Sequence, residues 1–144
     1  MSPVLRNHFS EYARFHATRG NQACHSLGIP MIVFAILAML AHVSVAPVGG
    51  FVLTAAEVLL AVITIYYLTL DAVLALLMLM VSAVFVAAGR HVPVLPALGV
   101  FVLGWILQFV DHYVYEKKAP AFFQNLTHLL VGPLWILAKA VGRA

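Results

Sequence analysis

Histidine is the residue type in this chain whose number and placement most suggest chemistry. Seven histidines accompany only eight basic and five acidic residues. Imidazole is a borderline ligand that suits iron, zinc, copper and nickel. The histidines concentrate around two polar stretches, residues 12–30 and 105–121, each of which adjoins a long apolar run. We therefore predict that the two stretches meet and form one metal site.

The first polar stretch needs a bend before its histidines can converge. His25 follows Asn21 by four residues, so these two side chains share one face of a helix. His16 precedes His25 by nine residues, which at about 100° per residue is near half a turn out of phase. Gly20 lies between the two histidines, and we expect the chain to turn there. Asn21 would then cap the helix that follows.

The second polar stretch places hydrogen-bonding partners beside His112. Gln108, His112 and Glu116 follow one another at four-residue intervals, and Asp111 and Tyr115 form a neighbouring stripe. Side chains four residues apart are neighbours on a helix surface. His112 is thus expected to have amide and carboxylate partners on its own helix.

These patterns predict a ligand set and a group of residues that orient it. The expected ligands are His16, His25 and His112, with His128 as a candidate fourth. Histidines with a carboxylate nearby and open coordination positions suit Fe(II) and dioxygen. The residues expected to hydrogen-bond to the ligands are Tyr12, Asn21, Gln108, Asp111 and Glu116.

An ordinary hydrogen-bonding role at a membrane surface is the alternative for any one of these histidines. We expect that role for His8, His42 and His91. Cys24 is the only cysteine, which excludes an internal disulfide and a thiolate-rich metal cage.

The composition is that of an integral membrane protein. Hydrophobic residues make up 64% of the chain and charged residues 9%, with a mean hydropathy of +1.03. Soluble domains have about 25% charged residues. The net charge of +3 comes mostly from residues outside the apolar runs, so it indicates topology and lipid contact, not nucleic-acid binding. The residues before the first apolar run do not have the pattern of a cleaved signal peptide.

Hydropathy predicts a single all-α membrane domain over residues 1–144. An N-terminal interfacial helix is expected at about 2–19, since apolar and polar residues alternate there with helical period. The four transmembrane helices are expected at about 27–45, 51–70, 72–88 and 95–112, with Pro30 in the first turn and Asp71 at a corner. The C-terminal segment at about 121–141, broken at Gly132-Pro133, is expected to be an interfacial or re-entrant helix pair.

The distribution of Lys and Arg predicts the orientation. With four spans, the basic residues of the N-terminal segment and those after the fourth span lie on one side, and only Arg90 lies on the other. Cytoplasmic loops carry the excess of Lys and Arg. We therefore expect the N-terminus and the site on the cytoplasmic side of a bacterial inner membrane or of an endoplasmic-reticulum-type membrane. Nothing in the sequence indicates the oligomeric state.

Two motifs resemble those of a known family. The first is Y-x3-H-x4-N-x3-H-x2-G-x-P at residues 12–30, and the second is W-x2-Q-F-x2-H-x3-E-x3-P-A at residues 105–121. Together they resemble the small membrane-bound, iron-dependent 2-hydroxy-fatty-acid dioxygenases of fatty-acid α-oxidation and phytosphingosine degradation. The resemblance implies that His16, His25 and His112 bind iron. Asp111 departs from the glycine usual at that position in the family.

The resemblance implies cleavage of the C1–C2 bond of a long-chain 2-hydroxy fatty acid, giving a fatty acid one carbon shorter. The partners would be this acid, dioxygen and the lipid bilayer. A 2-hydroxy carboxylate can chelate a metal through two oxygens, and Arg14, Arg19, Lys117 or Lys118 could attract its carboxylate. A haem-binding membrane electron carrier and a non-catalytic lipid-binding membrane protein are the alternatives. A di-iron desaturase is disfavoured because adjacent His-His pairs are missing.

Overall fold

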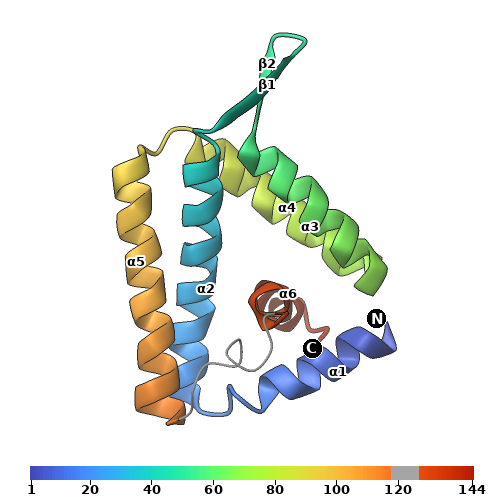
Figure 1. Ribbon diagram of the computed structural model, residues 1–144. Coiled ribbons are helices and arrows are strands. Elements are labelled where there is room, and N and C mark those ends of the chain that lie inside the picture. The colour runs from blue at the N-terminus through green and yellow to red at the C-terminus, as the bar shows by residue number, and fades with distance from the viewer. Residues whose placement is uncertain (118–126) are drawn as a thin grey trace. The chain divides into compact units, whose positions relative to one another are not determined.

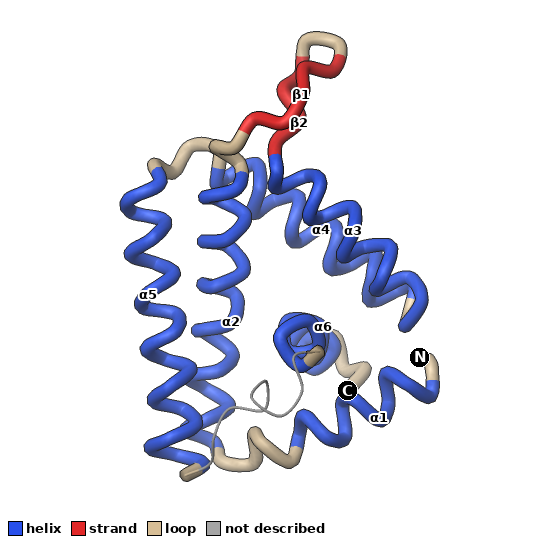
Figure 2. The backbone as a smooth tube through the Cα atoms, viewed as in Figure 1, coloured by secondary structure: helices blue, strands red, loops and turns tan. Residues whose placement is uncertain are grey.

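The computed structural model describes residues 1–117 and 127–144, and helices dominate both ranges (Figures 1 and 2). The elements in chain order are α1 (Pro3–Ala13), α2 (Arg19–Leu40), β1 (Ser44–Val48), β2 (Phe51–Thr54), α3 (Ala55–Leu70), α4 (Ala72–Gly89), α5 (Val94–Val110), the π-helical turn η1 (Asp111–Glu116) and α6 (His128–Ala140). They form two compact units: a terminal unit (Met1–Met31 and Leu103–Ala144) and a central unit (Ile32–Val102). The single membrane domain stays a prediction.

Among the described residues, three helices have the length and composition to cross a membrane. They are Arg19–Leu40, Ala72–Gly89 and the combined helix Val94–Glu116. The helix Ala55–Leu70 is apolar but has only 16 residues, which at about 1.5 Å per residue falls short of a hydrocarbon core of about 30 Å. The structure thus supports three spans, and a fourth stays a prediction, as does the interfacial position of α1.

A short turn and a β-hairpin replace the helix ends that we predicted at residues 41–45 and 51–54. Strands β1 and β2 pair antiparallel, with Val48 opposite Phe51. Gly49 and Gly50 both have positive φ, at 52° and 83°. Two such residues form the tight turn that favours a two-residue hairpin, and the valines beside them favour strands. The all-α class is confirmed for the chain, but the helix bounds predicted for this segment were wrong.

In the terminal unit, α1 is shorter than the predicted helix at 2–19. Ser2 caps it, its hydroxyl accepting from the Leu5 N–H at 3.2 Å, and α1 buries Leu5, Phe9 and Tyr12 along one face. The chain turns after Ala13, and the Thr18 hydroxyl accepts from the Asn21 N–H at 3.3 Å. Thr18 therefore caps α2, a role that we wrongly assigned to Asn21.

Gly20 does not make the bend that we predicted, because it lies inside the first turn of α2. A Cβ at this position would overlap the Tyr115 ring. Gly20 thus serves the close approach of η1 to α2. The earlier start of α2 also places Pro30 inside that helix, not in its first turn as expected.

Helices α2 and α5 approach closely at Gly28. A Cβ there would lie 2.6 Å from Gln108 Nε2 and 3.0 Å from the Gly104 carbonyl oxygen. We expect Gly28→Ala to lower the free energy of unfolding by about 1–3 kcal/mol, as overpacking does. Gly99→Ala is the matched control, since a Cβ on Gly99 meets nothing within 4 Å. That change should stabilise α5 by up to about 1 kcal/mol, and equal melting shifts for both variants in detergent would contradict this account.

In the central unit, Asp71 forms the corner that the sequence predicts. Its carboxylate accepts from the Leu74 N–H at 2.9 Å and caps α4. A small core of Leu37, Ala41, Ala56 and Val86 lies between the helices. None of the predicted site residues lies in the central unit.

Helix α6 is continuous across Gly132-Pro133, so the break predicted there is wrong. Pro133 lies near the start of α6 and removes only one N–H. Gly132 leaves room for a neighbour, since a Cβ on it would lie 2.6 Å from the Tyr12 hydroxyl oxygen. Residues 121–126 lie outside the described residues, as does Lys118, and the helix pair stays a prediction.

Candidate metal centre

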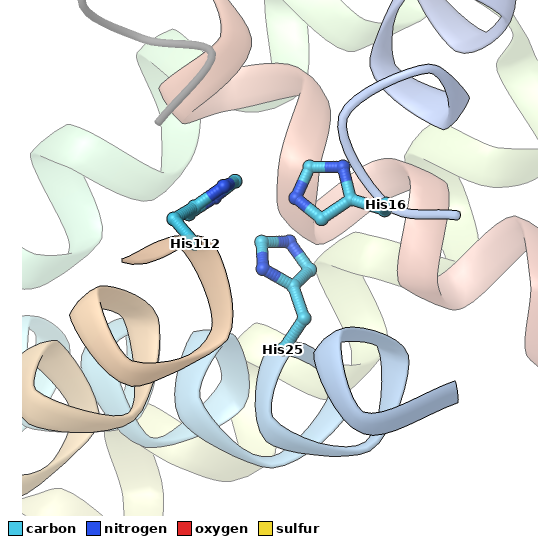
Figure 3. Close-up of side chains that lie close together, drawn as sticks. All are labelled: His16, His25 and His112. Atoms are coloured by element: carbon cyan, nitrogen blue, oxygen red, sulfur yellow. The ribbon is translucent and has the colours of Figure 1, made fainter. Parts of the chain in front are cut away.

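The structure brings His16, His25 and His112 together in the terminal unit (Figure 3). Each offers one ring nitrogen, and the three nitrogens lie within 4.8 Å of one another. His16 lies in the turn between α1 and α2, His25 on α2 and His112 on η1. The side chains are only 2%, 2% and 3% exposed. We call these three residues the histidine triad.

His16 is held in the tautomer that leaves Nε2 free to bind a metal. Its Nδ1 lies 2.7 Å from the Tyr12 carbonyl oxygen, which can only accept, so Nδ1 carries the proton. Its Nε2 is buried and has no hydrogen-bond partner among residues 1–117 and 127–144. Burial, followed by the nearby His25, lowers the pKa of His16 to about 3. His16 is thus neutral near pH 7, as a metal ligand must be.

The low pKa of His16 predicts how acid affects the metal-free protein. Between about 3, its folded pKa, and 6.5, its ordinary pKa, the unfolded state binds more protons than the folded state. The free energy of unfolding should therefore fall as the pH drops through this range, and His16→Gln should flatten that fall. Denaturant melts of both proteins at about pH 7.5 and about pH 4.5 would measure the difference. Identical pH slopes would contradict the buried neutral imidazole.

His25 lies between a carboxylate and a phenol. Its Nδ1 is 3.1 Å from Asp111 Oδ2, and its Nε2 makes a short hydrogen bond with the Tyr12 hydroxyl. If Nδ1 donates to the carboxylate, Nε2 has the lone pair, to which the Tyr12 hydroxyl donates. A carboxylate behind a histidine in this way raises the basicity of the other nitrogen. Burial, and then the Asp111 charge, raises the pKa of Tyr12 well above its ordinary value, so its hydroxyl stays protonated.

His112 and Asp111 are adjacent, and both point into the terminal unit. Asp111 is fully buried, and its Oδ1 lies 3.4 Å from His112 Nε2. His112 Nδ1 is buried without a hydrogen-bond partner in the described part of the chain. Both residues begin the π-helical turn η1, a geometry that is often found at functional sites. The sequence analysis did not predict this π-helical turn, because it used α-helical spacing for these residues.

The remaining predicted residues hold the segments around the triad. Asn21 is fully buried, and its Nδ2 donates to the Asp111 carbonyl oxygen at 3.3 Å. Glu116 Oε1 accepts from the Thr18 N–H at 2.6 Å, so it contacts the turn between α1 and α2 and not His112. Gln108 is buried on α5 beside Gly28. The first hydrogen bond ties η1 to α2, which carries His25, and the second ties η1 to the turn that carries His16.

Comparisons with known proteins identify the family of this chain. Residues 3–144 match the family described as 2-hydroxy-palmitic acid dioxygenase Mpo1-like. The chain is 32% identical over 136 residues to 2-hydroxy-palmitic acid dioxygenase MPO1 of Saccharomyces cerevisiae, covering 92% of this chain and 77% of the yeast protein. The chain belongs to the Mpo1-like family. No solved structure matches it.

The histidine triad of this Mpo1-like chain fits a transition-metal ion. Two of its nitrogens, His16 Nε2 and His112 Nδ1, are buried and unpaired among the described residues. Buried polar atoms without partners are costly, and a metal ion would satisfy both. Coordination through His25 Nε2 would require the Tyr12 hydroxyl to leave that nitrogen, because one lone pair serves one partner. Neutral imidazoles beside a carboxylate suit Fe(II) as well as zinc.

His128 lies outside the triad. It begins α6, and its Nε2 is 3.7 Å from Glu11 Oε2 on α1. Its ring meets the Tyr12 ring edge-on, with 5.7 Å between centroids. The His16 ring also contacts Tyr12, but it stacks on the Tyr12 ring, at 4.2 Å between centroids. The role of His128 as a fourth ligand stays a prediction.

Trp135 is the residue at the triad that sequence reasoning missed. It is buried on α6, with its ring 5.3 Å from that of Tyr12 and 5.7 Å from that of His16. In the sequence it looks like one more apolar residue of the last helix. Only the folded α1–α6 contact reveals that it closes one side of the site.

Proposed function

We propose that this protein is an Fe(II)-dependent dioxygenase that cleaves the C1–C2 bond of long-chain 2-hydroxy fatty acids and produces a fatty acid one carbon shorter. The observation that carries the proposal is the buried histidine triad, in a chain of the Mpo1-like family with a relative named as a 2-hydroxy-palmitic acid dioxygenase. The apolar helices support a membrane-dissolved substrate.

In this proposal His16, His25 and His112 hold the iron. When bound, Fe(II) supplies activation of dioxygen and Lewis-acid polarisation of the hydroxyl and carboxylate of the substrate. The three imidazoles come from three separate segments, so the fold must be complete before they converge. Hydrogen bonds from Asn21 and to Glu116 keep two of those segments in place.

Asp111 and Tyr12 have distinct tasks in the proposed site. The Asp111 carboxylate accepts from His25 Nδ1 and keeps Nε2 of that ring available as the ligand atom. The Tyr12 hydroxyl, once released from His25, is a protonated donor beside the substrate oxygens. Burial of both side chains, together with Trp135, keeps bulk water out.

The substrate carboxylate would be attracted by exposed cations near the triad. Arg14 and Arg19 flank His16 in the chain, and Lys117 follows η1. Lys118, the fourth predicted cation, lies outside the described residues. The acyl chain would remain among the apolar helices, and the bilayer would deliver it.

The proposed site faces the cytoplasm of a four-span protein. In a Cys24→Ser background, cysteines placed at positions 14 and 117 should both react with a membrane-impermeant maleimide from the cytoplasmic side. The positions carry the basic residues whose excess marks that side. A cysteine at position 90 should react from the other side. Labelling of positions 14 and 117 from opposite sides would contradict this topology.

Oxygen uptake by purified protein tests the activity. The protein is purified without chelators or nickel resin, loaded with Fe(II), and given 2-hydroxyhexadecanoic acid. We expect iron-dependent oxygen consumption with this acid, but not with hexadecanoic or 3-hydroxyhexadecanoic acid. Equal uptake with all three acids, or none, would contradict the proposal. A Soret band in the purified protein would favour a haem carrier instead.

A further inference from the structure

A second group of potential ligands lies in the terminal unit, outside the histidine triad. His8 and Glu11 are three residues apart on α1, and His128 is the first residue of α6. Residues three apart share a helix face, and α1 packs against α6. One ligand atom from each of the three residues lies within 4.8 Å of the others. We call these residues the α1–α6 cluster.

The nitrogens of this cluster lack the partners that buried polar atoms normally have. His8 Nδ1 and both ring nitrogens of His128 are buried and make no hydrogen bond within the described ranges. His128 is only 5% exposed. Glu11 Oε2 lies 3.7 Å from His128 Nε2, beyond the usual 2.7–3.2 Å of an N–H···O hydrogen bond. Two imidazoles and a carboxylate therefore lie close together, and none of these three nitrogens has a hydrogen-bond partner among the described residues.

We propose that His8, Glu11 and His128 form a second binding site, for a divalent transition-metal ion of the zinc or iron class. Two nitrogens and one carboxylate oxygen are ligands that such ions accept, whereas Mg²⁺ and Ca²⁺ prefer oxygen alone. The Glu11 side chain is 53% exposed, so the ion has an entry path and room for water ligands.

The second site is separate from the triad and shares no ligand with it. Tyr12 contacts both groups, since its ring stacks on His16 at 4.2 Å and meets His128 edge-on at 5.7 Å. An ion in the α1–α6 cluster would link the helix that carries Tyr12 to the helix that carries Trp135. It would thereby fix two aromatic walls of the triad without touching the substrate.

Cobalt binding tests the second site independently of the proposed oxygenase activity. Co²⁺ is titrated into metal-free protein that carries no histidine tag, and ligand-field absorbance counts the ions bound. We expect two equivalents in the wild type and one in Glu11→Gln and in His128→Gln. His91→Gln removes an exposed histidine of the central unit and should leave two. His25→Ala should lose the triad ion and keep the other.

Other outcomes separate the two sites. A single equivalent that disappears in Glu11→Gln would support the second site and count against metal binding by the triad. A single equivalent that disappears in His25→Ala but survives in Glu11→Gln would overturn the second site. Two equivalents in Glu11→Gln and His128→Gln would also overturn it.

Thermal unfolding distinguishes the metal site from its alternative, a simple ion pair between Glu11 and a protonated His128. Zn²⁺ should raise the melting temperature of the wild type by more than that of Glu11→Gln, because an ion that binds only the folded state stabilises it. A lower melting temperature of Glu11→Gln without metal, with the same Zn²⁺ shift as the wild type, would leave the ion pair as the explanation and overturn the metal site.

Discussion

His16→Ala, His25→Ala and His112→Ala should each abolish iron retention and oxygen uptake. Each variant removes one nitrogen from a cluster whose three ligand atoms lie within 4.8 Å of one another. Loss of a group that merely supports a metal ligand costs about 10–100-fold in metal affinity or activity, so loss of a ligand should exceed that range. Iron content by mass spectrometry and turnover with 2-hydroxyhexadecanoic acid measure the two effects.

His42→Ala is the matched control for these variants. His42 Nε2 is 2.8 Å from the Val92 carbonyl oxygen, and both residues belong to the central unit, whereas the triad belongs to the terminal unit. It should retain iron and turnover at the level of the wild type. Triad variants that folded normally and kept wild-type iron would show that the three histidines are not the ligands.

Asp111→Asn should weaken Fe(II) binding by about 10–100-fold, the range found when an orienting partner of a metal ligand is removed. The change keeps the size of the side chain but removes the charge that lies 3.1 Å from His25 Nδ1. An amide can also present its NH₂ group to that nitrogen, which favours the wrong tautomer of His25. Equilibrium titration with Fe(II) under anaerobic conditions would give the ratio of dissociation constants.

Glu116→Gln serves as the control for Asp111→Asn. Glu116 ends the same π-helical turn, but its carboxylate contacts the Thr18 N–H and no triad nitrogen by hydrogen bond. Its substitution should therefore change metal affinity much less. Similar losses in both variants would indicate a general effect of charge near the site, and no special role for the Asp111–His25 contact.

The structure brings together three of the four histidines that the sequence predicts as ligands, and His128 is not among them. His16 and His25 are out of phase on a single helix, so a shared site required a bend between them, and the structure has one. The position of the bend was less predictable. Gly20 is the residue that the sequence favours for the bend, yet Thr18, two residues earlier, caps the start of α2 through its hydroxyl. Gly20 instead accommodates the Tyr115 ring. A glycine suits both a bend in the chain and the close approach of a neighbouring side chain. Only the packing in the folded structure shows which of the two roles Gly20 has.

Other features depended on information that hydropathy and helical periodicity do not carry. The hairpin around Gly49 and Gly50 has a recognisable turn signal, but hydropathy alone extended the neighbouring helices into it. Trp135 and the partners of His128 depend on how α6 packs on α1, across a long interval of sequence. The π-helical spacing of η1 likewise shifts Glu116 away from His112 toward Thr18. Helical periodicity could not predict any of these three.

Isotope labelling at C1 tests the central claim most directly. Fe(II)-loaded protein is given 2-hydroxyhexadecanoic acid that carries ¹³C only at C1, under air and under argon. We predict pentadecanoic acid without the label, formed under air and only by protein that retains iron. A fatty acid product that keeps the ¹³C label, or the same yield under argon, would contradict oxygen-dependent cleavage between C1 and C2.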